Sequence, residues 1–198
     1  MDKNLSVFSA AYWKAAAAEC HKINRLTLAA LVIALSVVIG SFFIPVAANL
    51  HISFNFLVVA FGSMIYGPFV GIIAGAVIDI IGYILHPFGA FFPGYTLSSM
   101  LGCLIYALFL YRSRITVLRI FLAKLIVNFG VNVGLGCLWS AMLMGKGYLF
   151  FLANSLIKNT LMLPIETVML VVLLQILLPA LTRAHLIQDQ HSKHISLI

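Results

Sequence analysis

Long apolar stretches alternate with short breaks along the chain, and their lengths predict helices rather than strands. Prolines and glycines mark the breaks, as at Pro45, at Gly67 and Pro68, and in the segment 86–94; such residues end helices. About 20 apolar residues cross the hydrocarbon core of a bilayer. The pattern therefore predicts an all-α membrane protein, a compact bundle of six transmembrane helices. These are expected at residues 27–43, 54–66, 69–85, 95–111, 117–144 and 150–178.

The charge content excludes a soluble fold. Hydrophobic residues make up 63% of the 198 residues and charged residues only 9%, whereas roughly a quarter of an ordinary soluble domain is charged. Asp79 is the one charged residue between positions 26 and 111, and a stretch of that kind needs lipid as its solvent. The net charge of +7 comes from basic residues at the ends of apolar segments. That placement is typical of topology signals rather than of a nucleic-acid surface.

The two ends of the chain are more polar than the middle. Residues 5–25 combine aromatic and basic side chains, which predicts an amphipathic helix at the membrane surface; a frayed cytoplasmic tail is the alternative. No apolar core of a signal peptide is evident in the first 26 residues. We therefore expect a cytoplasmic N-terminal segment at 1–26, a six-helix substrate-binding domain at 27–181 and a polar cytoplasmic tail at 182–198.

The distribution of Lys and Arg predicts the orientation in the membrane. Six spans place both termini and the second and fourth connections on one side, and cytoplasmic connections are the ones enriched in these residues. Only Lys146 lies in a connection of the opposite side, and Lys158 lies within the last helix. Both termini are therefore expected to be cytoplasmic. The basic residues of that side are Lys3, Lys14, Lys22, Arg25, Arg112, Arg114, Arg119, Lys124, Arg183 and Lys193.

Polar groups within the spans are candidates for function, because they are costly in lipid. Asp79, Lys158 and Glu166 are the ionisable ones identified from the sequence. Lys158 is expected in the outer half of the bundle, where it contacts a ligand or forms an ion pair with one of the two acids. Asn128 and Asn132, four residues apart, share one helix face. The deeper Asn128 favours a hydrogen bond between helices.

The segment 86–95 carries aromatic rings beside prolines and glycines. Phe88, Phe91, Phe92 and Tyr95 suit stacking against a flat heteroaromatic ligand; an interfacial aromatic belt is the alternative. Motifs of metalloproteases, serine hydrolases and nucleotide-binding loops are missing from the sequence. The three cysteines are odd in number and widely spaced, which predicts reduced thiols with no disulfide and no metal site.

Small residues recur at four-residue spacing, and such pairs let helices approach closely in lipid. Most of them are expected to pack internally. The pairs are Ala30 with Ala34, Gly71 with Gly75, and Gly130 with Gly134.

Several short motifs, in this order, resemble the S component of energy-coupling factor vitamin transporters, in particular the folate subgroup. The S component is the substrate-binding membrane subunit. The strongest matches are FPGYTLS at 92–98 and IKNTLMLPIE at 157–166. The others are YWK at 12–14, LAALVIAL at 28–35, NLHISF at 49–54 and YGPFVG at 66–71.

The resemblance implies a subunit of the bacterial cell membrane that captures a B vitamin with high affinity. ATP would be hydrolysed by two ATPase partners that act with a transmembrane coupling protein; the chain itself is expected to be no enzyme and to need no cofactor, metal or nucleic acid. In this family the Ala30 and Ala34 pattern packs against the coupling protein. Loops and helix ends on the external side line the vitamin site. The candidate substrate-binding residues are His51, Ser53, Asn55, Phe91, Phe92, Tyr95, Asn132, Trp139, Lys158 and Asn159.

Two departures from the family pattern leave the vitamin open. Family members often have Arg at the position of His51, and often another just before the last helix, where this chain has Asn154 and Ser155. Paired Arg side chains suit the two carboxylates of folate. Folate remains the expectation, with pantothenate or another B vitamin as the alternative. A membrane scaffold and an intramembrane enzyme using Asp79, Glu166 or His86 are the hypotheses from other classes.

Overall fold

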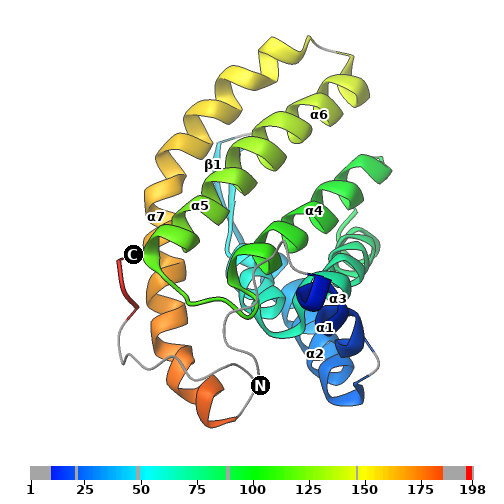
Figure 1. Cartoon of the computed structure of the whole chain (residues 1–198). Coiled ribbons are helices and arrows are strands. Elements are labelled where there is room, and N and C mark those ends of the chain that lie inside the picture. Colours follow the sequence, from blue (N-terminus) through cyan, green and yellow to red (C-terminus); the bar gives the residue numbers. More distant parts are fainter. Residues whose placement is uncertain are drawn as a thin grey trace.

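The computed structural model describes residues 10–20, 22–47, 50–87, 90–145, 147–184 and 195–197. It is a helical molecule with one short β-hairpin (Figure 1). Its elements are α1 (Ala10–Glu19), α2 (Ile23–Gly40), β1 (Phe43–Ala47), β2 (Leu50–Ser53), α3 (Asn55–Leu85), α4 (Pro93–Leu110), α5 (Val117–Leu125), the π-helix η1 (Ile126–Leu135), α6 (Gly136–Met144) and α7 (Tyr148–Arg183).

Five helical stretches of the described chain are long and apolar enough to cross a membrane, so the chain is a multi-pass membrane protein. One of these stretches joins α5, η1 and α6 without a break, over Val117–Met144, as the sequence predicted. The predicted helices at 54–66 and 69–85 are the two parts of α3, which meet at a kink. Gly67 breaks the α-helical geometry within it, with φ of 79°, a conformation that favours glycine because it lacks a Cβ atom.

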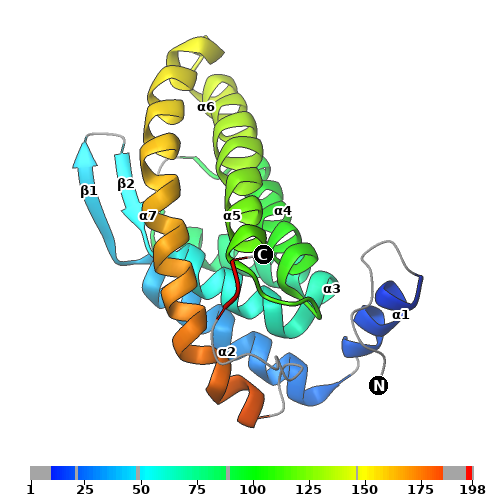
Figure 2. The ribbon, with the colours of Figure 1, turned by 60° about the vertical axis from the view of Figure 1, so that its left-hand side comes forward.

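The hairpin was not predicted from the sequence. Residues 44–53 were expected only to connect two helices, and in this region β1 and β2 pair in antiparallel fashion, with Phe43 opposite Ser53 and Ile44 opposite Ile52. Helix α2 also ends earlier than expected, at Gly40, so Pro45 lies on β1 and does not end the helix. The hairpin lies beside α7 (Figure 2). The chain is otherwise helical, as predicted, and the hairpin is a short addition between α2 and α3.

Close helix packing holds the α3 region together. A Cβ atom added at Gly75 of α3 would lie 2.8 Å from the carbonyl oxygen of Ser99 and 2.9 Å from Cα of Met100, both on α4. The two backbones therefore touch there, as the small-residue spacing predicted for Gly71 and Gly75. At Gly130 and Gly134, the nearest atoms belong to residues of their own helix, so among the described residues that pair makes no such approach.

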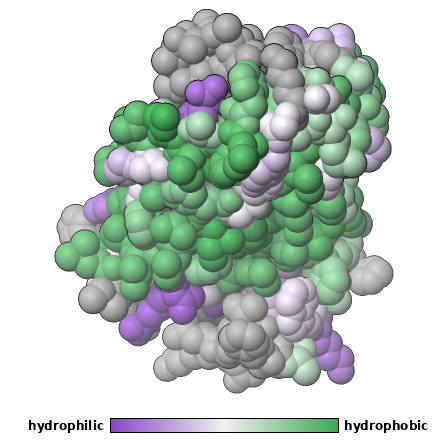
Figure 3. Space-filling model, turned by 90° about the horizontal axis from the view of Figure 1, so that it is seen from above, coloured by the Kyte–Doolittle hydropathy of each residue, from purple (hydrophilic) through white to green (hydrophobic). Residues whose placement is uncertain are grey.

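The outside of the bundle is apolar. On α7, exposed aliphatic side chains recur every three or four residues, which places them on one helix face. Apolar residues also cover most of the described surface seen from above (Figure 3). Lipid is the solvent that suits such a surface. The α7 stripe, which faces away from the core, consists of Ile157, Leu161, Ile165, Val168, Val172 and Ile176.

The first and the last described segments pack onto the bundle. Helix α1 falls within the predicted segment 5–25, and its buried Tyr12 and Ala16 cluster with Ala107 and Tyr111 of the α4 region. The hydroxyl of Tyr12 donates to the carbonyl oxygen of Ala107 at 3.4 Å. At the other end, Ser196 forms a parallel bridge with Thr116. The position of α1 on a membrane surface stays a prediction.

Candidate functional site

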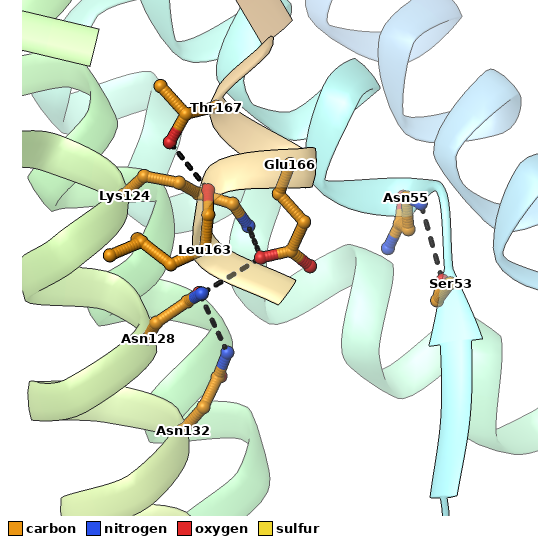
Figure 4. Close-up of polar contacts among 8 residues, drawn as sticks. All are labelled: Ser53, Asn55, Lys124, Asn128, Asn132, Leu163, Glu166 and Thr167. Atoms are coloured by element: carbon orange, nitrogen blue, oxygen red, sulfur yellow. Dashed lines mark hydrogen bonds and ion pairs between the residues drawn. The ribbon is translucent and has the colours of Figure 1, made fainter. Parts of the chain in front are cut away.

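A row of polar side chains runs along the stretch of α5 and η1 that faces α7 (Figure 4). Lys124 Nζ lies 3.0 Å from Oε2 of Glu166 on α7. The side-chain amide of Asn128 donates to the same oxygen at 2.8 Å. The amide of Asn132 then donates to Oδ1 of Asn128 at 3.5 Å. We call these four residues the polar row.

The inner part of the polar row is buried. The side chains of Lys124 and Glu166 are 2% and 15% exposed, and Asn128 is fully buried. The ammonium group of Lys124 also lies 3.8 Å from the ring centroid of Phe56, at the first turn of α3, in a cation–π contact. Two charges are tolerable inside a membrane protein only with such compensation. The predicted interhelical hydrogen bond of Asn128 is confirmed.

This arrangement corrects the expected ion pairs. Glu166 is paired with Lys124, not with Lys158. Asp79 instead accepts a hydrogen bond from the Thr96 hydroxyl at 2.7 Å, which joins α3 to α4. Lys124 was counted from the sequence as a cytoplasmic topology signal, but it lies buried within a span.

Asn128 and Asn132 lie on the π-helical segment η1. A π-helix has i→i+5 hydrogen bonds, is rare, and occurs frequently at functional sites. The polar row begins just before this segment, at Lys124, and ends within it at the exposed Asn132. A polar track thus leads from the buried ion pair to the surface.

Three of the predicted aromatic residues form a second group. The ring of Phe92 lies 5.5 Å from that of Trp139 on α6 and 6.2 Å from that of Tyr95 on α4, measured between centroids. A Cβ atom at Gly94 would meet the rings of Phe92 and Trp139 at under 3 Å, so this position has no room for a side chain. Phe91 packs elsewhere, against Tyr83 at 5.2 Å. We call Phe92, Tyr95 and Trp139 the aromatic group.

Hydrogen bonds fix two members of the aromatic group. The indole Nε1 of Trp139 donates to the Ser98 hydroxyl at 3.0 Å. The Tyr95 hydroxyl lies 3.2 Å from that of Ser140. These bonds tie α4 to α6 and hold the rings in place, while Tyr95 remains 37% exposed. Rings with fixed positions and partial exposure are suited to stacking against a planar ligand.

Lys158 and Asn159 lie on α7, toward its start from Glu166. Lys158 is half-buried, and no hydrogen bond or ion pair joins it to another residue of the described ranges. Asn159 is buried, but its amide donates to the carbonyl and hydroxyl oxygens of Ser155, one turn earlier on the same helix. Within the described ranges the ammonium group of Lys158 can therefore still accept an anionic partner, whereas the side-chain amide of Asn159 already hydrogen-bonds within its own helix.

The remaining candidates lie at the hairpin and the start of α3. The backbone of His51 pairs with that of Pro45 in the hairpin, and its side chain lies outside the described part of the structure. The Ser53 hydroxyl accepts a hydrogen bond from the backbone N–H of Asn55 at 3.3 Å. Oδ1 of Asn55 is buried and has no hydrogen-bond partner among the described residues. No hydrogen bond within the described residues joins Ser53 or Asn55 to the polar row, from which they stand apart in Figure 4.

Sequence reasoning missed four residues of these groups. Lys124 and Phe56 belong to the polar row and its surroundings, and Ser98 and Ser140 anchor the aromatic group. The spacing of Lys124, Asn128 and Asn132 by four residues was the available signal for Lys124, because side chains at that spacing share a helix face. The predicted partner residues Ala30 and Ala34 are both exposed on α2.

Comparison with known proteins gives a consistent picture. A family model described as the substrate-specific component of ECF transporters matches residues 24–186. The folate transporter FolT of Clostridium novyi (strain NT) is 34% identical over 149 residues, which cover 75% of this chain and 87% of that protein. The FolT of Leuconostoc mesenteroides subsp. mesenteroides is 30% identical over 150 residues, 72% of this chain and 80% of that protein.

A solved structure is also similar. The crystal structure of FolT bound with folic acid is 33% identical in sequence to this chain and superposes with a TM-score of 0.67. The match covers 74% of this chain and 88% of that one.

Proposed function

Because the chain belongs to the family of substrate-specific components of ECF transporters, we propose that it is the high-affinity folate-binding subunit of an ATP-driven importer. The likeness to FolT bound with folic acid, over most of both chains, carries the proposal. The site geometry supports it, because folic acid has a flat pteridine ring for the aromatic group and two carboxylates for a cation. Pantothenate or another B vitamin is the alternative, since His51 stands where family members often have Arg.

The proposed binding mode uses the two groups of side chains described above. Phe92, Tyr95 and Trp139 stack against the pteridine ring, and Asn132 at the exposed end of the polar row hydrogen-bonds to its edge. Lys158 pairs with a carboxylate of the glutamate tail, because a half-buried ammonium in a membrane protein needs an anion. His51, Ser53, Asn55, Phe91 and Asn159 complete the set proposed from the sequence.

The proposed assembly follows from the family. The transmembrane domain at 27–181 lies in the bacterial cell membrane with both termini in the cytoplasm. A transmembrane coupling protein and two ATPase subunits supply the energy, and ATP hydrolysis takes place on those partners. Ala30 and Ala34 offer a flat exposed strip on α2 for the coupling protein, since small side chains let helices approach closely in lipid.

Titration calorimetry on the purified chain tests this proposal. We expect folic acid to bind far more tightly than pantothenate. Lys158→Met should weaken folic acid binding by about 1.5–3 kcal/mol, the contribution of a charged hydrogen bond, or roughly ten- to hundred-fold in Kd. Leu161→Met, on the apolar face of the same helix, is the matched control and should bind as the wild type does.

Other outcomes would contradict specific parts of the proposal. If pantothenate bound more tightly than folic acid, pantothenate and not folate would be the proposed substrate. A chain that binds neither vitamin would favour a scaffold. Unchanged folic acid binding by Lys158→Met would remove Lys158 from the site.

A further inference from the structure

The hydrogen bonds of the polar row all run the same way, because each residue donates toward Glu166. We propose that its buried ion pair fixes the orientation of both amides, so that Asn132 offers its carbonyl oxygen Oδ1 to the ligand as a hydrogen-bond acceptor. The Lys124–Glu166 pair and Asn128 are then positioning residues that set which edge of the ligand's ring is recognised. This inference rests on the proposed function, because it names how that site distinguishes ligands.

Glu166 is the acceptor that fixes the orientation of the neighbouring amide. An ionised carboxylate only accepts hydrogen bonds and an ammonium only donates them. Glu166 Oε2 receives Lys124 Nζ at 3.0 Å and Asn128 Nδ2 at 2.8 Å. Turning the Asn128 amide over would place its carbonyl oxygen against the carboxylate, two acceptors in contact. Because Asn128 is fully buried, bulk solvent does not reach it to relieve that repulsion.

The orientation of Asn128 in turn fixes that of Asn132. With Nδ2 of Asn128 held by Glu166, its Oδ1 faces Asn132 and accepts from Nδ2 of that residue at 3.5 Å. The orientation of an amide is assigned from its hydrogen-bond network, and here the network favours the orientation that turns Nδ2 of Asn132 toward Asn128. Oδ1 of Asn132 receives no hydrogen bond from any residue in the described ranges, and the side chain is exposed. The row therefore ends in an acceptor.

An acceptor at this end selects a donor on the ligand. The partner that fits is a heteroaromatic ring with an exocyclic amino group at its edge, and the 2-amino group of the 2-amino-4-oxopteridine of folic acid is such a donor. A ring edge that carries only acceptors would meet Oδ1 with its lone pairs and would bind more weakly. Lys158, by contrast, recognises carboxylates, so the two residues act on different parts of one ligand.

The test compares two ligands on the full chain, folic acid and its analogue with methyl in place of the 2-amino group. We expect the wild type to bind the analogue about tenfold or more less tightly than folic acid. Asn132→Leu, at an exposed position that the fold tolerates, should bring the two dissociation constants to within about twofold of each other. The double variant Lys124→Met/Glu166→Gln should do the same, because a neutral amide at 166 can face Asn128 with either end.

Thr167→Val is the matched control. Thr167 is a buried polar residue next to Glu166, but its hydroxyl donates to the Leu163 carbonyl oxygen of its own helix at 2.7 Å, apart from the row (Figure 4). The ratio of its dissociation constants for the analogue and folic acid should equal that of the wild type. If Asn132→Leu or the folded double variant distinguished the two ligands as strongly as the wild type does, the role of the row would be overturned while folate binding stayed in place. A wild type that binds neither ligand would instead refute the proposed function, and this inference with it.

Discussion

At the scale of single residues, the Lys124–Glu166 pair makes a prediction about stability. Removing one partner of a buried ion pair leaves the other charge uncompensated, and that costs about 3–5 kcal/mol. We therefore expect Lys124→Met and Glu166→Gln to lower the midpoint of thermal unfolding in detergent strongly when made singly. The unfolding midpoint of the double variant should lie nearer to that of the wild type. A double variant that loses as much as the two single variants together would show that the pair acts through other contacts.

The candidate site was only partly predictable at this scale. Asn128 was predicted to hydrogen-bond between helices, and Phe92 and Tyr95 were predicted from their aromatic character and from the family resemblance. The partner of Glu166 was not, because an ion pair between two helices depends on their rotation and axial offset. The sequence shows the charges and their depth, but not which helix faces which. Lys124 was accordingly read as a topology signal, although Glu166 required a cation somewhere in the bundle.

At the scale of elements, apolar length predicted the helices well and their ends less well. The stretch Val117–Met144 agrees with its prediction, since a long apolar run allows little else in lipid. The β-hairpin after α2 was missed because its strands are short and contain Pro45, which disfavours pairing in the middle of a sheet. The break at Gly67 and the new helix that follows it were both predicted.

The contact between α3 and α4 at Gly75 gives a matched pair of substitutions. A methyl group at Gly75 would meet backbone atoms of α4 at under 3 Å, and overpacking of this kind costs about 1–3 kcal/mol. Gly82, on the same helix, has no atom of another described element within 4 Å of an added Cβ. We expect Gly75→Ala to lower the thermal unfolding midpoint and Gly82→Ala to leave it unchanged or raise it slightly. Equal effects would mean that α3 and α4 can separate without loss.

At the scale of the whole molecule, the orientation in the membrane rests on the distribution of basic residues. With Lys124 buried in an ion pair, nine Lys and Arg residues remain on the side predicted to be cytoplasmic, against Lys146 on the other. The asymmetry is still large. In a cysteine-free background, single cysteines at Arg114 and Lys146 should react with an impermeant reagent from opposite sides, Lys146 from outside. Labelling of both from one side would contradict the arrangement of spans.

The strip of Ala30 and Ala34 on α2 tests the proposed assembly, because coupling to a partner can be separated from binding the vitamin. Both residues are exposed, so tryptophan at either position fits the isolated chain but prevents close approach of another helix. We expect Ala30→Trp and Ala34→Trp to bind folic acid as the wild type does. Uptake of labelled folic acid by cells that also make the coupling module should fall sharply.

Leu161→Trp is the matched control for that experiment, because Leu161 is 66% exposed on the apolar stripe of α7 and the proposal places no partner there. It should bind and transport as the wild type does. Normal uptake by both alanine variants would move the partner surface to another helix. Loss of folic acid binding in the isolated variants would show instead that the strip contributes to the packing of the chain itself. Binding without uptake, confined to the α2 variants, is the result that assigns this strip to the partner.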